Sequence, residues 1–133
     1  ERKQLVSGQA IALADGRTVR PEDVLGEAQL GTKFVYIGDV GRTHNLPNIV
    51  READAMVIEA TYLNEEAEMA RDFGHLTARQ AAQLARDSGV QKLILTHISR
   101  RYREKDVIEE AHTIFTNAVV ARDFDHFKIA REK

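Results

Sequence analysis

Three short apolar runs constrain the fold of this chain more than any other feature. They cover residues 33–37, 55–58 and 93–95, and they are rich in β-branched, aliphatic or aromatic side chains, which is typical of buried strands. Helical patterns separate them, and the clearest follows Thr77, which has capping-box spacing to Gln80. Because strands alternate with helices, the sequence predicts an α/β fold with a largely parallel sheet.

Turn residues predict the elements outside these runs. A loosely alternating segment at residues 5–13 leads to Asp15 and Gly16, which suit a tight β-connection. Residues 20–26 are expected to be a polar connection, and Pro47 fits the first turn of a short helix that runs to about residue 53.

The second half of the chain carries its own start and stop signals. Asn64 is expected to cap a helix that ends at Gly74, and Asp106 is expected to begin another helix. Residues 118–121 are predicted to form the last core strand, followed by an edge strand with Phe127 and Ile129. No linker or repeat interrupts the pattern, so residues 1–133 are predicted to form one structural unit.

The composition excludes several classes of protein. The 133-residue chain is 43% hydrophobic with a formal charge of −2, so it can bury a core but lacks a global basic field for nucleic acid. The absence of cysteine excludes disulfides and thiolate metal sites. No apolar run approaches the roughly 20 residues of a membrane span, so we expect a cytoplasmic protein without membrane contact. Because the chain begins at Glu1 rather than Met, we expect a processed product or a piece of a longer protein.

Three successive predicted strands end in ionisable residues, namely Asp39, Glu59 and His97. Ligands of open α/β sheets bind outside the carboxyl ends of the strands, so these residues mark a candidate site. Carboxylate and imidazole groups suit a divalent metal such as Zn²⁺ or Mn²⁺. Two ligands are too few for a catalytic zinc, so we expect that this chain does not close a metal site alone.

His75 lies just before the predicted helix start at Thr77. Free backbone N–H groups and the helix dipole attract anions there, so His75 is well placed to donate a proton to a leaving oxygen. Arg100 and Arg101 follow His97 and are cations suited to phosphate.

Four ordered motifs together resemble ribonuclease Z, the family of tRNA 3′-processing endonucleases of the metallo-β-lactamase fold. The motifs are Tyr-Ile-Gly-Asp at 36–39, Ile-Glu-Ala-Thr at 58–61, Gly-His-Leu-Thr-Ala at 74–78 and Leu-Thr-His-Ile-Ser-Arg-Arg-Tyr at 95–102. The resemblance extends from about Leu13 to Ile129. It implies the C-terminal αβ half of a metallo-β-lactamase sandwich, with helices on one face of the sheet.

The resemblance also implies a set of residue roles around two zinc ions. Asp39 matches the aspartate that bridges the metals, and His97 matches a ligand of one of them. His75 matches the histidine that assists proton transfer, and Glu59 matches its carboxylate partner. Thr77 and Arg101 match positions that contact substrate phosphate.

The chain departs from the family pattern at several motif positions and lacks one motif entirely. Ile58 stands where the motif usually has His, Leu76 where it usually has Ser, and Val40 where Thr commonly follows the bridging Asp. No His-x-His-x-Asp-His motif occurs in the chain. The resemblance therefore implies an N-terminal half that carries most metal ligands and the tRNA-binding arm, with precursor tRNA as substrate and a homodimer as the assembly. We expect the isolated chain to be inactive.

Two alternatives remain open. Another hydrolase of the same fold, acting on small phosphodiesters or sulfate esters, would share ligands of the Asp39 and His97 type. A non-catalytic half-fold that acts as an association module would expose an apolar sheet edge and helix face.

Overall fold

The computed structural model describes residues 1–131. These residues divide into two compact units, one covering Glu1–Leu30 and the other beginning at Gly31, where the sequence pattern had suggested a single unit. Each unit is described by itself. None of the helices described is long and apolar enough to cross a membrane.

The first unit is a small hairpin flanked by two short helices. Its elements are α1 (Arg2–Val6), β1 (Ile11–Ala12), β2 (Thr18–Val19) and α2 (Pro21–Val24), with β1 and β2 antiparallel. The predicted turn is confirmed: Gly16 has a φ of 83°, which glycine adopts without strain, and the Arg17 N–H donates to Asp15 Oδ1 at 3.1 Å. The polar connection predicted at 20–26 instead contains α2, because Pro21 opens a helical turn and Asp23 Oδ2 accepts from the Arg20 N–H.

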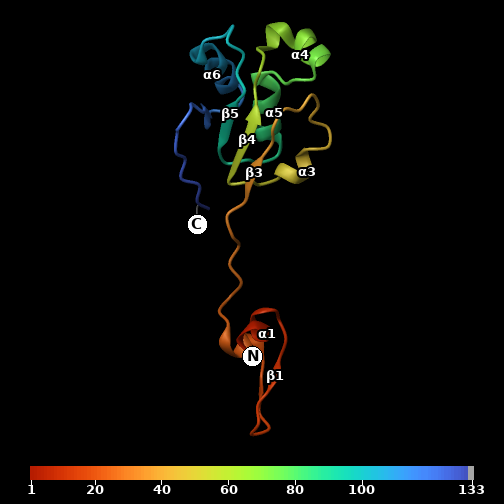
Figure 1. Cartoon of the computed structure of the whole chain (residues 1–133), viewed down its shortest axis with the longest axis vertical. Helices are drawn as coiled ribbons and strands as arrows, with labels where there is room; N and C mark the ends of the chain where they lie inside the picture. Colours follow the sequence, from red (N-terminus) through yellow and green to blue (C-terminus); the bar gives the residue numbers. More distant parts are fainter. Residues whose placement is uncertain (132–133) are drawn as a thin grey trace. The chain divides into compact units, whose positions relative to one another are not determined.

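The second unit is built on a four-stranded parallel sheet (Figure 1). The strands are β3 (Phe34–Tyr36), β4 (Ala55–Glu59), β5 (Leu93–Thr96) and β6 (Ala118–Val120), in the order β3-β4-β5-β6. Every neighbouring pair is parallel, so the predicted strands and the predicted sheet type are both confirmed. All five residues of β4 are buried, as expected for a central strand of a parallel sheet.

Five helical segments connect the strands. They are α3 (Pro47–Val50), the 3₁₀ turn η1 (Asn64–Glu66), α4 (Ala67–Phe73), α5 (Ala78–Asp87) and α6 (Glu104–His112). The Thr77–Gln80 capping box is confirmed, and Gly74 ends α4 with a φ of 74°. The short predicted helix at 47–53 stops earlier, at Val50.

Two predicted helix starts are wrong. Asn64 does not cap its helix with its side chain; its N–H instead donates to the Glu110 carboxylate at 2.9 and 3.1 Å. Helix α6 begins at Glu104 rather than Asp106, because Asp106 lies within the first turn and pairs back to Arg103 at 2.7 and 2.9 Å.

One face of the sheet carries the hydrophobic core. Successive strand residues point to opposite faces, so Met56 and Ile58 share a face with Leu93 and Leu95. These four residues belong to a single buried cluster with the small apolar face of α5 and with Val107 and Ala111 of α6. On the opposite face Phe34 and Tyr36 are 50% and 69% exposed.

The segment after β6 returns to the amino ends of the strands. Phe127 lies under the Lys92 ammonium, 5.4 Å from its ring centroid, and Arg131 donates to the Gly31 carbonyl at 3.1 Å. The edge strand predicted around Phe127 and Ile129 is wrong, because side-chain contacts of this kind hold the segment without a backbone ladder.

Candidate metal centre

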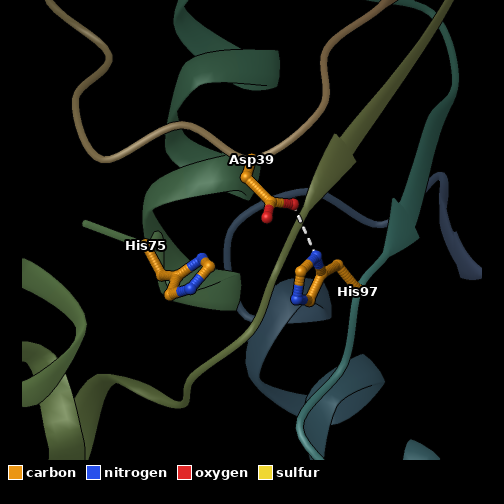
Figure 2. A group of neighbouring side chains, drawn as sticks. All are labelled: Asp39, His75 and His97. Carbon is orange, nitrogen blue, oxygen red and sulfur yellow. Dashed lines mark ion pairs between the residues drawn. The ribbon is translucent and has the colours of Figure 1, made fainter. Parts of the chain in front are cut away.

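Three ionisable side chains meet at the carboxyl edge of the sheet. Asp39 lies just beyond β3, His97 immediately follows β5, and His75 lies in the loop between α4 and α5. Each offers a ligand atom, and these atoms lie within 4.8 Å of one another. Figure 2 shows the Asp39 carboxylate and the two imidazole rings converging on one space. The sequence predicted Asp39 and His97 at this edge, and the structure brings His75 within reach of the same point.

The two members predicted as metal ligands contact each other directly. His97 Nδ1 lies 2.5 Å from Asp39 Oδ1, and both side chains are about half exposed. The His97 backbone has a φ of 54°, which a residue with a side chain seldom adopts and which tends to occur at functional sites. The ring of His75 lies 5.2 Å from that of His97, centroid to centroid.

Glu59 lies beneath this cluster and is fully buried. Its Oε1 accepts from the Val40 N–H at 2.6 Å, and its Oε2 accepts from the Leu76 N–H at 3.1 Å and from the Thr61 hydroxyl at 2.6 Å. His75 Nδ1 lies 3.0 Å from Oε2. The carboxylate is therefore satisfied by four donors, which is what a buried charge requires.

These bonds link the loop of Asp39 to the loop of His75. Val40 follows Asp39 and Leu76 follows His75, so one carboxylate fixes both loops. Because Glu59 occupies Nδ1 of His75, the Nε2 atom remains for substrate or metal. The sequence suggested the Glu59–His75 pairing but not the contributions of Val40 and Thr61.

A glycine contact brings the same two loops together. A Cβ placed on Gly41 would lie 2.9 Å from Gly74 Cα and 3.0 Å from Gly74 C. Backbone atoms cannot move aside as a flexible side chain can, so the absence of a side chain at Gly41 permits this approach. Gly41 is not among the glycines with positive φ, and its contact is with a residue distant in the sequence, so no local pattern predicted its importance.

Thr77 does not lie on the surface, where a contact with substrate phosphate was expected. It is fully buried, and its hydroxyl accepts from the Gln80 N–H at 3.1 Å as the cap of α5. The free N–H groups expected beside His75 are also engaged. Thr77 donates to Gln80 Oε1, Ala78 to the Tyr62 carbonyl and Arg79 to Glu110 Oε1, each at 2.9 Å.

Arg101 also lies outside the Asp39–His75–His97 cluster. Its guanidinium donates to Glu66 Oε1 at 2.6 Å and lies 5.5 Å above the Tyr62 ring centroid. These contacts attach the loop after His97 to η1 and to a ring next to His75.

The donor set suits a divalent metal. One carboxylate and imidazole nitrogens at the rim of a sheet are ligands that Zn²⁺ and Mn²⁺ accept in proteins. The parallel sheet and this cluster at its carboxyl edge together define an α/β protein with a candidate metal-binding site.

The model of the beta-lactamase superfamily domain matches residues 7–98, and the chain belongs to that family. It is 48% identical to ribonuclease Z from Bradyrhizobium diazoefficiens over 96% of this chain and 42% of that protein. The resemblance to ribonuclease Z that the motifs indicated is thereby confirmed. The chain spans about two fifths of the length of the curated relatives it matches.

Solved structures confirm the α/β fold class. The crystal structure of human tRNase Z, short form, matches with a TM-score of 0.61 and 25% identity, over 86% of this chain and 37% of that one. The metallo-beta-lactamase fold protein YhfI from Bacillus subtilis matches with a TM-score of 0.61 and 23% identity, over 66% of this chain and 36% of that one.

Proposed function

We propose that this chain forms one wall of the active site of an endoribonuclease that cleaves a phosphodiester at the 3′ end of precursor tRNA. The observation that carries this proposal is the buried Glu59 carboxylate that holds His75 beside Asp39 and His97. Similarity to ribonuclease Z supports the substrate. A precursor tRNA substrate is consistent with the cytoplasmic location expected above.

Asp39 and His97 are the residues that would hold metal, and zinc is the metal we propose, two ions per complete site. Such ions supply an activated water and stabilise the attacking and leaving oxygens. In this chain, the contact with His97 holds Asp39 at the rim, and the Val40 N–H bond to Glu59 fixes the backbone that carries it.

His75 is proposed to transfer a proton to the leaving oxygen. Glu59 accepts at Nδ1 and so sets the orientation of the ring, which leaves Nε2 as the atom that exchanges a proton with substrate. The partly buried His75 side chain lies next to the more exposed His97, which supports access of substrate to the His75 ring.

The two predicted phosphate contacts take different parts in the proposal. Thr77 acts through the helix it caps, because its buried hydroxyl fixes the start of α5 and with it the loop of His75. Arg101 is held by Glu66, so a direct phosphate contact would require substrate to replace that carboxylate.

The complete site is proposed to need a second segment that contributes the remaining metal ligands. The exposed Phe34 and Tyr36 of the edge strand β3 support this, because apolar side chains on a parallel sheet are normally covered. We also propose that the complete enzyme is a homodimer, which sedimentation would reveal.

Complementation tests this function. The isolated chain should not cleave precursor tRNA, whereas mixing it with a separately produced N-terminal half of the enzyme should restore cleavage at the 3′ end. Cleavage of a model phosphodiester or sulfate ester but not of precursor tRNA would favour another hydrolase of the fold. Absence of any cleavage with both segments folded would count against the proposal.

A further inference from the structure

A pocket of about 360 Å³ lies directly beside His97. One wall is the loop from His97 to Tyr102, and the other is the turn that follows β6, including Arg122 and Asp123. Its volume is within the range of pockets that hold small organic ligands. Because His97 itself lines it, anything bound there would lie next to the candidate metal centre.

The turn that forms the second wall presents an aromatic side chain to solvent. Phe124 is 96% exposed, the highest value among the exposed large hydrophobic residues. Its backbone has a φ of 69°, a strained conformation for a bulky residue. Of the three non-glycine residues with positive φ in the described part of the chain, His97 lines this pocket and Phe124 directly follows the lining residue Asp123.

The turn is held firmly despite its exposure. The Arg122 N–H donates to Asp125 Oδ2 at 2.9 Å, and the Asp125 N–H donates to the Arg122 carbonyl at 3.1 Å. The Arg122 guanidinium binds both oxygens of Glu104 at 2.8 and 3.0 Å, which ties the turn to the start of α6. An exposed aromatic ring on a fixed, strained turn contributes little to folding, and such features concentrate at functional sites.

The polar groups of the pocket suit a nucleotide. Arg100 makes no ion pair within residues 1–131 and can therefore contact a phosphate, whereas Arg122 is engaged by Glu104. Ser99 brings a hydroxyl group to the same wall, whereas the Tyr102 hydroxyl is buried, without a hydrogen-bond partner among the described residues, and would have to turn to reach a ligand. The Arg100 cation and the Ser99 hydroxyl favour ribose phosphate over the apolar surface of a protein partner, and the Asp123 carboxylate, which also lines the pocket, suits a ribose hydroxyl rather than the phosphate.

We propose that Phe124 is a stacking platform for a nucleobase of the RNA substrate, and that the attached ribose phosphate enters the pocket between the His97 loop and the turn after β6. This inference rests on the proposed function and names where one nucleotide beside the scissile phosphate is held. Aromatic rings bind single-stranded bases through their faces with little dependence on sequence.

The chain lacks tryptophan, so Phe124→Trp would introduce a single fluorescent reporter at the proposed platform. A short single-stranded RNA should quench this tryptophan, and an abasic ribose-phosphate oligomer of equal length should not. Phe34→Trp is the matched control, because Phe34 is also exposed but lies at the amino end of β3. Its fluorescence should not respond to either oligomer.

Affinity measurements with labelled RNA complete the test. Phe124→Leu keeps an apolar side chain without a ring and should weaken binding by roughly tenfold, whereas Phe124→Tyr should bind like the wild type. If the wild type binds RNA but Phe124→Leu binds equally well, the stacking proposal is wrong while the proposed function stands. If the wild type binds no RNA, the stacking proposal is wrong, whereas the proposed function fails only if the chain mixed with the N-terminal half also cleaves no precursor tRNA. If Phe124→Leu changes only the sedimentation of the chain, the residue is a protein contact and the proposal is overturned.

Discussion

The Glu59 carboxylate and Nδ1 of His75 lie 3.0 Å apart, at the point where two loops of the candidate site are fixed by one buried charge. Val40 and Leu76 donate to the same carboxylate from either side. The proton-transfer residue and the neighbour of a predicted metal ligand therefore share one acceptor. Any change at Glu59 should affect both loops together.

Glu59→Gln should lower the free energy of unfolding by about 1–3 kcal/mol, because the amide NH₂ would face a backbone or side-chain donor and leave a buried group unpaired. Urea unfolding of the purified chain would measure this. Glu65→Gln, on the exposed surface of η1, is the control and should change stability little. Equal stability of the two variants would contradict the role of Glu59 as the shared acceptor.

Gly41→Ala should separate the Asp39 loop from the His75 loop. Its Cβ would lie 2.9 to 3.1 Å from three backbone atoms of Gly74, so one backbone must move, at a cost of about 1–3 kcal/mol. The zinc affinity of the chain mixed with the N-terminal half should fall together with the free energy of unfolding, because Asp39 moves with its loop. Gly38→Ala is a close control, since no atom lies within 4 Å of its added Cβ. If the two alanine variants have the same zinc affinity and the same stability, the close approach of Gly41 to Gly74 contributes to neither property.

His75 and His97 should differ in what they do to metal. Calorimetric titration with Zn²⁺ of the chain mixed with the N-terminal half should show at least tenfold weaker binding in His97→Gln and Asp39→Asn. His75→Gln should bind within about threefold of the wild type, because Nδ1 is engaged by Glu59 and the role we propose for Nε2 is proton transfer. His126→Gln, which lies on the exposed turn after β6, serves as the control. An equal loss in His75→Gln and His97→Gln would make His75 a ligand instead.

The Arg122–Glu104 pair should make the turn after β6 sensitive to acid. The hydrogen bond from the Arg122 side chain lowers the pKa of Glu104 below its ordinary value, so the pair stabilises the fold above the unfolded pKa and loses this effect as pH falls through the folded pKa. Arg122→Met should therefore be less stable than the wild type at neutral pH and converge with it in acid. If the difference in stability between Arg122→Met and the wild type persists after Glu104 is protonated, the packing of the Arg122 side chain and not its charge accounts for that difference.

Local patterns predicted the parts of the fold that local sequence determines. The three apolar runs formed β3, β4 and β5, and the Thr77–Gln80 spacing formed a capping box, because strand pleating and helix capping depend on neighbouring residues. Asp39 and His97 were placed at one sheet edge because parallel strands end together.

Contacts between distant residues account for what the sequence did not predict. Glu110 of α6 accepts hydrogen bonds from the N–H groups of Asn64 and Arg79. At Asn64 it replaces the expected side-chain cap. At the start of α5 it occupies the position where a bound anion was expected. Glu66 likewise engages Arg101, which the sequence had assigned to phosphate. Neither carboxylate lies near its partner in the sequence, and no local pattern signals such pairs.

Cleavage of precursor tRNA by the complemented chain tests the central claim most directly. The chain mixed with a separately produced N-terminal half should cut the precursor at its 3′ end, and His75→Gln should lower the rate by about 100-fold or more while both segments still associate. If the folded, associated segments cut no precursor tRNA, or if His75→Gln cuts it as fast as the wild type, the account is contradicted.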